Sequence, residues 1–124
     1  FPTRHLVNKI AVAQTKPLVA AALTQWEGQI SVYDPASNAP CYACIFPNVP
    51  DRELVPSCAE AGVVGPLPGV IGSMMAVETV KLITGAGAPL RGSLLIYDAL
   101  YGETRIIKAK RRADCAICGA DPLP

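Results

Sequence analysis

The chain has 124 residues, about the size of one ordinary domain, and its net charge of +1 argues against a nucleic acid or an anionic membrane as partner. Hydrophobic residues make up 51% and charged residues 17%, which is more apolar than a water-exposed surface requires, so some apolar faces are expected to meet something outside this chain. No apolar run approaches the roughly 20 residues of a membrane span and no signal peptide is recognisable, so we expect a cytoplasmic protein.

The first half of the chain predicts a helix, two strands and a long loop. Apolar residues at helical spacing predict a helix from Thr3 to about Gln14, with Thr3 as its N-cap. Alternating and β-branched residues then predict strands near 18–23 and 29–34. Residues 36–66 have no sustained period but contain three of the five cysteines, so we expect a long functional loop there.

The second half contains the clearest element, the run PLPGVIGSMMAVETVKLITG. Pro68 stands near its start and Gly85 follows its end, as at helix boundaries, and apolar residues cover most of its circumference. We therefore expect a largely buried helix. The runs SLLIYDA and ETRIIKAK, separated by LYG, predict a β-hairpin, and the basic run KAKRR at 108–112 is expected to be a solvated strand end.

Four of the five cysteines form two C-x-x-C pairs, about seventy residues apart: Cys41 with Cys44, and Cys115 with Cys118. Zn²⁺ prefers a tetrahedron of soft ligands, and each C-x-x-C lets two sulfurs reach one ion. The spacing predicts a closed structural Cys₄ zinc site that joins the middle of the chain to its C-terminal end. A dithiol redox couple and unliganded buried thiols are the alternatives, whereas a cytosolic chain with an odd cysteine count argues against disulfides.

Two isolated residues have a chemistry of their own. Cys58 lies alone in VPSCAEAGVVGP, within the predicted loop, and a lone cysteine is either an inert small residue or a nucleophile. His5 is the only histidine, and an exposed position on the first helix is expected for it. The glycines of GVVGPLPGVIG match neither G-x-x-x-x-G-K-[ST] nor G-x-G-x-x-G, so they do not predict a phosphate loop.

Six segments together resemble a known family: TRHLVN, PLVAAALTQWEGQISVYD, PCYACIFP, SCAEAGVVGPLPGVIGSMMAVETVKLITG, GSLLIYDAL and CAICG. In this order they resemble the C-terminal half of the ThiF/MoeB/HesA proteins, which are bacterial relatives of ubiquitin-activating enzymes. The resemblance implies an α/β fold: the C-terminal half of a Rossmann-like ubiquitin-activating-type adenylation domain, with a mixed sheet and a Cys₄ zinc knuckle pair. Residues 1–124 would be the C-terminal part of a single such domain, with the nucleotide-binding part upstream.

The resemblance also implies a reaction. Family members bind ATP and Mg²⁺ and transfer AMP to the C-terminal glycine of a ubiquitin-like sulfur carrier protein, in molybdopterin, thiamine or related thio-cofactor biosynthesis. The whole enzyme is expected to be a homodimer. The family's glycine-rich loop, phosphate clamps and Mg²⁺-binding Asp would all precede Phe1, so this chain alone is expected to be inactive.

The resemblance assigns roles to particular residues. Arg4 falls on a family arginine near the nucleotide, which makes it the candidate nucleotide-binding residue. Cys58, the candidate catalytic residue, falls where some members use a cysteine to form a thioester or acyl disulfide with the carrier, although members that serve molybdopterin synthesis adenylate without it. A zinc module that binds a protein partner without chemistry is the alternative function, and a dithiol oxidoreductase is the third. The family's structural zinc ligands correspond to Cys41, Cys44, Cys115 and Cys118.

Overall fold

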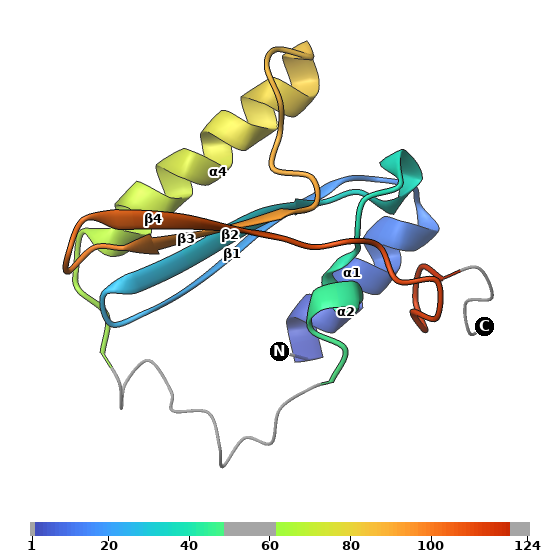
Figure 1. Cartoon of the computed structure of the whole chain (residues 1–124), viewed down its shortest axis with the longest axis horizontal. Coiled ribbons are helices and arrows are strands. Elements are labelled where there is room, and N and C mark those ends of the chain that lie inside the picture. Colours follow the sequence, from blue (N-terminus) through green and yellow to red (C-terminus); the bar gives the residue numbers. More distant parts are fainter. Residues whose placement is uncertain (1, 49–61, 120–124) are drawn as a thin grey trace.

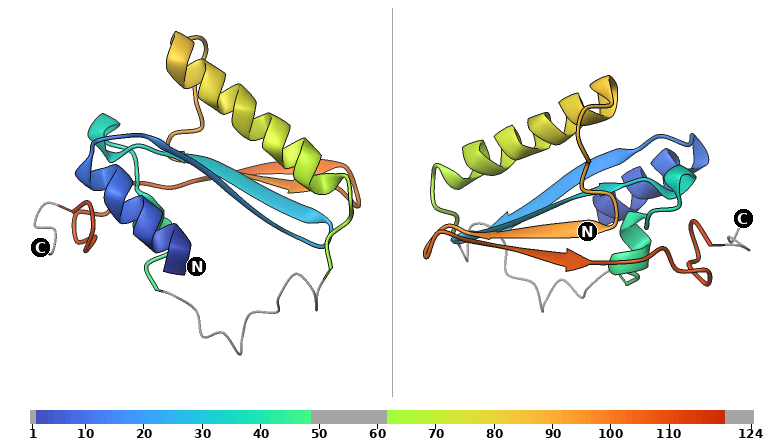
Figure 2. Two further views of the ribbon diagram at one scale, coloured as in Figure 1. Left: turned by 180° about the vertical axis from the view of Figure 1, so that it is seen from behind. Right: turned by 45° about the horizontal axis from the view of Figure 1, so that its top comes forward.

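The computed structural model describes residues 2–48 and 62–119. In chain order its elements are α1 (Pro2–Ala13), β1 (Leu18–Thr24), β2 (Glu27–Tyr33), the 3-10 turn η1 (Pro35–Ser37), α2 (Tyr42–Ile45), α4 (Leu67–Thr84), β3 (Ser93–Asp98) and β4 (Glu103–Lys108). Figures 1 and 2 show α4 crossing over one side of a sheet, while α1 and α2 lie on the other side, close to the C-terminal segment. The predicted α/β class is confirmed.

The four strands form one sheet in the order β1-β2-β3-β4, and every neighbouring pair is antiparallel. The β1–β2 hairpin turns at Gln25, which has a φ of 46°, and the β3–β4 hairpin is the one that the sequence predicts. Among the described residues, parallel pairing occurs in two isolated bridges, so within this part of the chain the expected mixed character of the sheet rests on those contacts. Strand β1 forms one edge of this sheet.

Helix α4 begins and ends where the sequence predicts. Two prolines lie in its first turn region, and Gly85 closes it with a φ of 73° and an N–H that donates to Lys81 O at 2.8 Å. The expectation of a largely buried helix is wrong, since only Leu67, Ile71 and Glu78 are buried. Apolar side chains cover most of its circumference, but among the described residues its main packing partners are β1 and β2, which lie on one face.

Helix α4 also corrects the expectation that no segment is long and apolar enough to span a membrane. Its 18 residues contain only two charged side chains, and among the described helices it passes a test of length and hydropathy for such a span. The core helices of water-soluble proteins pass the same test, so this property assigns no membrane role to the chain.

Two contacts hold α4 in place, one to the sheet and one to the segment that follows the helix. Ile71, only 1% exposed, packs over Gly28 of β2 so closely that a Cβ on Gly28 would lie 2.4 Å from Ile71 Cδ1. Near the other end, the buried carboxylate of Glu78 accepts a hydrogen bond from Leu90 N at 2.7 Å and pairs with Lys81 at 2.5 Å. The hydrogen bond from Leu90 therefore holds the segment between α4 and β3 against the helix.

Helix α1 is confirmed, although Thr3 lies inside it and is not its N-cap. Pro2 occupies the first helical position, which suits proline because its fixed φ is helical and its missing N–H would have no partner there. Asn8 is the one buried residue of α1. His5 is half-buried and not exposed as expected, with its ring edge-on to Tyr42 at a centroid distance of 5.2 Å.

Large apolar side chains remain exposed on three elements, as the composition predicts. Such surfaces normally meet another protein surface. They are Leu6, Val7 and Ile10 on α1, Val70, Val77, Val80 and Ile83 on α4, and Ile106 and Ile107 on β4.

Candidate metal centre

The first cysteine pair stands on a single turn of helix that the sequence does not predict. The predicted loop 36–66 contains α2, which begins directly after Cys41 and includes Cys44. Residues three positions apart lie on the same side of a helical turn, so the two Sγ atoms come within 3.9 Å of each other. A helix this short, surrounded by prolines, has no period that could reveal it.

The second pair stands on a tight turn that only glycine can complete. Cys115 N donates to Arg112 O at 3.1 Å, and Gly119 N donates to Cys115 O at 2.9 Å. A Cβ on Gly119 would lie 2.4 Å from Cys115 O and 2.5 Å from Ala113 O, and backbone atoms cannot yield easily. The glycine after the second C-x-x-C is therefore part of the site.

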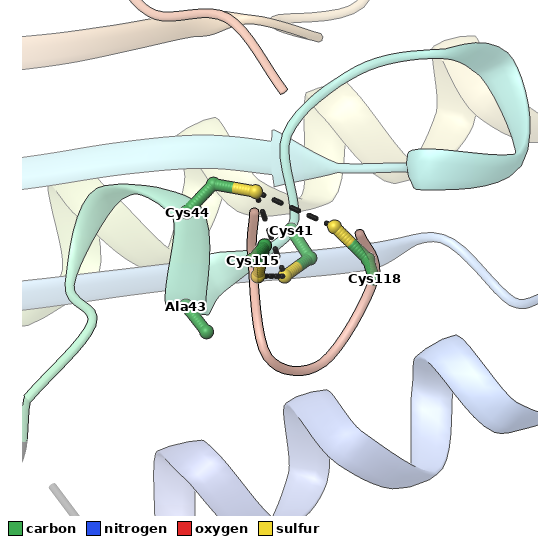
Figure 3. Packing of buried hydrophobic residues seen from close by; sticks show 5 residues of the cluster. All are labelled: Cys41, Ala43, Cys44, Cys115 and Cys118. Atoms are coloured by element: carbon green, nitrogen blue, oxygen red, sulfur yellow. Dashed lines mark hydrogen bonds between the residues drawn. The ribbon is translucent and has the colours of Figure 1, made fainter. Parts of the chain in front are cut away.

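The fold brings the two pairs together, as Figure 3 shows. All four sulfurs lie within 4.8 Å of one another, and all four residues are buried. Across the two segments, Cys41 Sγ lies 3.7 Å from Cys115 Sγ and Cys44 Sγ lies 3.4 Å from Cys118 Sγ. The mid-chain turn and the C-terminal turn thus present their sulfurs to one another.

These distances fit one tetrahedral ion. With Zn–S bonds of about 2.3 Å, the edge of a sulfur tetrahedron is about 3.8 Å. The three Sγ separations given above, 3.4 to 3.9 Å, lie around that value. They are far longer than the roughly 2.05 Å of a disulfide, and the four described cysteines are free thiols. The cluster can therefore hold a metal, and a soft ion of Zn²⁺ size suits it.

The acidity of the thiols is set by their burial and by nearby backbone N–H groups. Burial raises the pKa of both Cys41 and Cys44 above the usual range. Burial also opposes ionisation of Cys115, but hydrogen bonds from the N–H groups of Cys118 and Ile117 and from the Cys41 and Cys44 thiols together outweigh it and lower the pKa of Cys115 to about 7. A metal ion entering the site has to displace protons from the first pair, and its charge compensates for the buried thiolates.

Several groups outside the four sulfurs support them. Asn8 Nδ2 lies 3.5 Å from Cys41 Sγ, and the backbone N–H of Arg112 donates to Cys44 Sγ at 3.5 Å. The Arg111 guanidinium donates to Cys118 O. The sequence predicts the four ligands but none of these supporting groups. Asn8 lies opposite the apolar residues Leu6, Val7 and Ile10 of α1, a position that by itself predicts a side chain in solvent.

Of the two other candidate residues, only Arg4 is described. Its Nη1 donates to Ala21 O at 2.6 Å, on edge strand β1, beside a small cavity of about 40 Å³ that Tyr33, Tyr42 and Phe46 also line. Arg4 therefore lies near the first cysteine pair without touching a sulfur. Cys58 lies outside the described residues.

Comparison with known proteins gives a consistent result. The ThiF family model matches residues 1–117. The chain is 48% identical to the sulfur carrier protein adenylyltransferase of Thermus thermophilus, over 98% of this chain and 46% of that protein. It is 44% identical to the adenylyltransferase and sulfurtransferase MOCS3 of Mus musculus, over 98% of this chain and 26% of that protein.

Solved structures show the same fold. The crystal structure of E. coli MccB superposes with a TM-score of 0.77 at 21% identity, and the match covers 97% of this chain and 36% of MccB. The chain thus spans less than half the length of each of these relatives. From the family match over nearly its whole length, the chain belongs to the ThiF family.

Proposed function

We propose that this chain is the C-terminal part of a single adenylation domain, in an ATP-dependent adenylyltransferase that activates the C-terminal glycine of a ubiquitin-like sulfur carrier protein. Molybdopterin, thiamine or related thio-cofactor biosynthesis is the proposed setting. The observation that carries the proposal is the 48% identity, over 98% of the chain, to a protein named sulfur carrier protein adenylyltransferase. The shared ThiF family and the MccB fold agree with it.

The reaction divides between this chain and sequence outside it. A carboxylate oxygen of the carrier's glycine forms a bond to the α-phosphorus of ATP, and pyrophosphate leaves. Mg²⁺ and basic side chains offset the charge that develops on the phosphates. This chain has no glycine-rich phosphate motif, so the binding of ATP and Mg²⁺ is proposed for sequence outside it.

The proposed role of the cysteine cluster is structural. Four sulfur ligands saturate a tetrahedral Zn²⁺, so such a site leaves no position for a substrate. Its contribution is to hold α2 and the C-terminal turn together, because the free energy of metal binding becomes free energy of folding. Cys41, Cys44, Cys115 and Cys118 would provide the four bonds.

Arg4 and Cys58 are the proposed reactive-site residues of this chain. Arg4 Nη1 donates a hydrogen bond to Ala21 O on the edge strand β1. We propose that the guanidinium charge lies close to the bound nucleotide. The Cys58 thiolate would attack the carbonyl carbon of the acyl adenylate. A C–S bond then forms, the C–O bond to AMP breaks, and AMP leaves with the electron pair.

We also propose that the enzyme is a cytoplasmic homodimer. The exposed apolar side chains of α1, α4 and β4 support the proposal that another protein surface packs against this chain. The free buried thiols suit a reducing compartment. The partner that the reaction requires is the sulfur carrier protein itself.

Carrier-dependent exchange of radiolabelled pyrophosphate into ATP tests the proposed activity. The intact protein should catalyse the exchange only when a carrier with its C-terminal glycine is present, and this chain by itself should not. If the intact protein binds carrier but exchanges no pyrophosphate, the alternative of a non-catalytic zinc-binding interaction module replaces the proposal. Pyrophosphate exchange by this chain alone would contradict the proposal that ATP and Mg²⁺ bind to sequence outside it.

The role of Cys58 is tested separately. In the intact protein, Cys58→Ala should leave pyrophosphate exchange unchanged but reduce the onward transfer of carrier or sulfur. If both steps run at the unmodified rate, Cys58 has no chemical role.

A further inference from the structure

Helix α1 is packed against the rest of the fold by its polar side. Asn8 is 1% exposed, whereas Leu6, Val7 and Ile10 of the same helix are 44 to 58% exposed. A buried side-chain amide costs free energy unless its hydrogen-bonding groups are satisfied, so a helix that buries an asparagine needs specific partners for it.

Both ends of the Asn8 amide have such partners, and both partners lie at the start of the turn that carries the first cysteine pair. Its Oδ1 accepts a hydrogen bond from Tyr42 N at 3.0 Å, and its Nδ2 lies 3.5 Å from Cys41 Sγ, a usual separation for a bond to sulfur. Tyr42 N is the first N–H of α2, and Cys41, which precedes it, makes no side-chain cap bond. Asn8 therefore caps α2 from another helix and holds the Cys41 sulfur at the same time.

The electrostatics of a loaded site give that contact a function. Four thiolates around one Zn²⁺ leave a net charge of −2, and N–H groups that donate to the sulfurs withdraw part of that charge. The donors to the first pair include Asn8 Nδ2, at Cys41, and the backbone N–H of Arg112, at Cys44. The Asn8 donor is a side chain, so substitution can remove it without altering the backbone of the site.

Neighbouring residues of α1 extend the contact along the helix. His5 lies edge-on to Tyr42 on the N-terminal side of Asn8, and Val12 packs against the cysteine cluster on the C-terminal side. The successive positions 5, 8 and 12 follow helical spacing and form one side of α1. This side meets the metal centre and its supporting helix.

We propose that Asn8 is a positioning residue of the metal centre, which donates to the Cys41 thiolate and, through the cap on α2, makes the placement of α1 depend on the bound metal. The inference goes beyond the proposed adenylyltransferase activity and does not rest on it. Any metal ion held by these four cysteines would depend on Asn8 in the same way.

The first test compares two chemically identical substitutions in the intact protein. Asn8→Asp keeps an oxygen acceptor for Tyr42 N but replaces the donor with a negative charge beside the thiolates. Asn48→Asp makes the same change on an exposed residue and serves as the matched control. We expect Asn8→Asp to weaken zinc binding by about 10 to 100-fold in a chelator competition, the range typical of lost outer hydrogen bonds, and Asn48→Asp to change it by less than about twofold.

Cobalt substitution separates a role at the metal from a general loss of stability. A thiolate without its hydrogen-bond donor gives up electrons more readily, so the sulfur-to-cobalt charge-transfer band of Co²⁺-loaded Asn8→Asp should move to longer wavelength. A residue that serves only packing would leave the band of the loaded protein unchanged. An unshifted band together with an affinity equal to that of the control would overturn the proposal.

Hydrogen exchange on the unsubstituted protein tests the link to α1 and needs no variant. Removing zinc with a chelator should accelerate exchange of the α1 amides at least tenfold, and should affect the α4 amides less, because α4 is held by Gly28 and the sheet. Equal acceleration in α1 and α4, or none in α1, would overturn the link.

Discussion

The contact between Gly28 and Ile71 offers a quantitative test of how α4 is seated. A methyl group added at position 28 would lie 2.4 Å from Ile71 Cδ1 and 2.6 Å from Cγ1, whereas carbon atoms in contact are normally about 3.5 to 4.0 Å apart. Ile71 is 1% exposed, so its side chain has little room to move away. Overpacking of this kind costs about 1 to 3 kcal/mol, which exceeds the roughly 0.5 to 1 kcal/mol that alanine gains over glycine within a strand.

The assay is urea unfolding of the zinc-loaded chain with a double-mutant cycle. Gly28→Ala should lower the free energy of unfolding by about 1 to 2 kcal/mol, and Ile71→Ala alone by about 2 to 5 kcal/mol. Together they should cost less than their sum by at least about 1 kcal/mol, because alanine at position 71 lacks both the Cδ1 and the Cγ1 that the new methyl group would strike. Additive effects would refute the contact.

Gly72→Ala is the matched control for that cycle. Gly72 is exposed on α4, and a Cβ there would meet no atom of the described residues within 4 Å. The substitution should raise the stability of this chain by about 0.5 to 1 kcal/mol, the usual gain of alanine over glycine in a helix. A loss instead would mean that this side of α4 is closely packed.

Substitutions at three further positions test other contacts of the fold. Gly119→Ala should weaken zinc binding by at least tenfold in a chelator competition, because its Cβ would strike Cys115 O and Ala113 O, while an unchanged affinity would show that the turn can adapt. Arg91→Met should lower the free energy of unfolding in urea by about 1 to 3 kcal/mol, because the buried Asp34 carboxylate loses the guanidinium that lies 2.8 Å away. Arg91 is partly exposed, so this cost is smaller than that of breaking a fully buried pair. Glu78→Ala should lower the free energy of unfolding by about 1 to 3 kcal/mol, because Leu90 N loses its acceptor. Glu78→Gln keeps an acceptor and should lower it clearly less. Equal losses would contradict the role of that hydrogen bond.

The elements that the sequence predicts correctly are those whose evidence is local. The strands of both hairpins and the two long helices follow from periodicity, and the helix end at Gly85 follows from the left-handed conformation that glycine adopts readily. The four-cysteine cluster was also predictable, because two C-x-x-C pairs far apart in the sequence favour one shared tetrahedral site. The structure confirms that the pairs meet.

The features that the sequence does not predict are contacts between elements that lie far apart along the chain. An apolar helix surface such as that of α4 shows that a partner is favoured, not that one is present in this chain. A polar residue in a helix, such as Asn8, is normally assigned to solvent, and nothing local shows that its amide faces a sulfur thirty-three positions away. The burial of His5 against Tyr42 has the same cause.

The central structural claim is that one metal ion, bound by all four clustered cysteines, joins the middle of the chain to its C-terminal turn. Elemental analysis of protein purified without chelator, combined with mass spectrometry after alkylation, tests it most directly. We expect one zinc ion per chain, with four of the five cysteines protected until the metal is removed, and no stoichiometric zinc in Cys41→Ser or Cys118→Ser. Protein that contains no metal and whose four clustered thiols react freely would contradict the account.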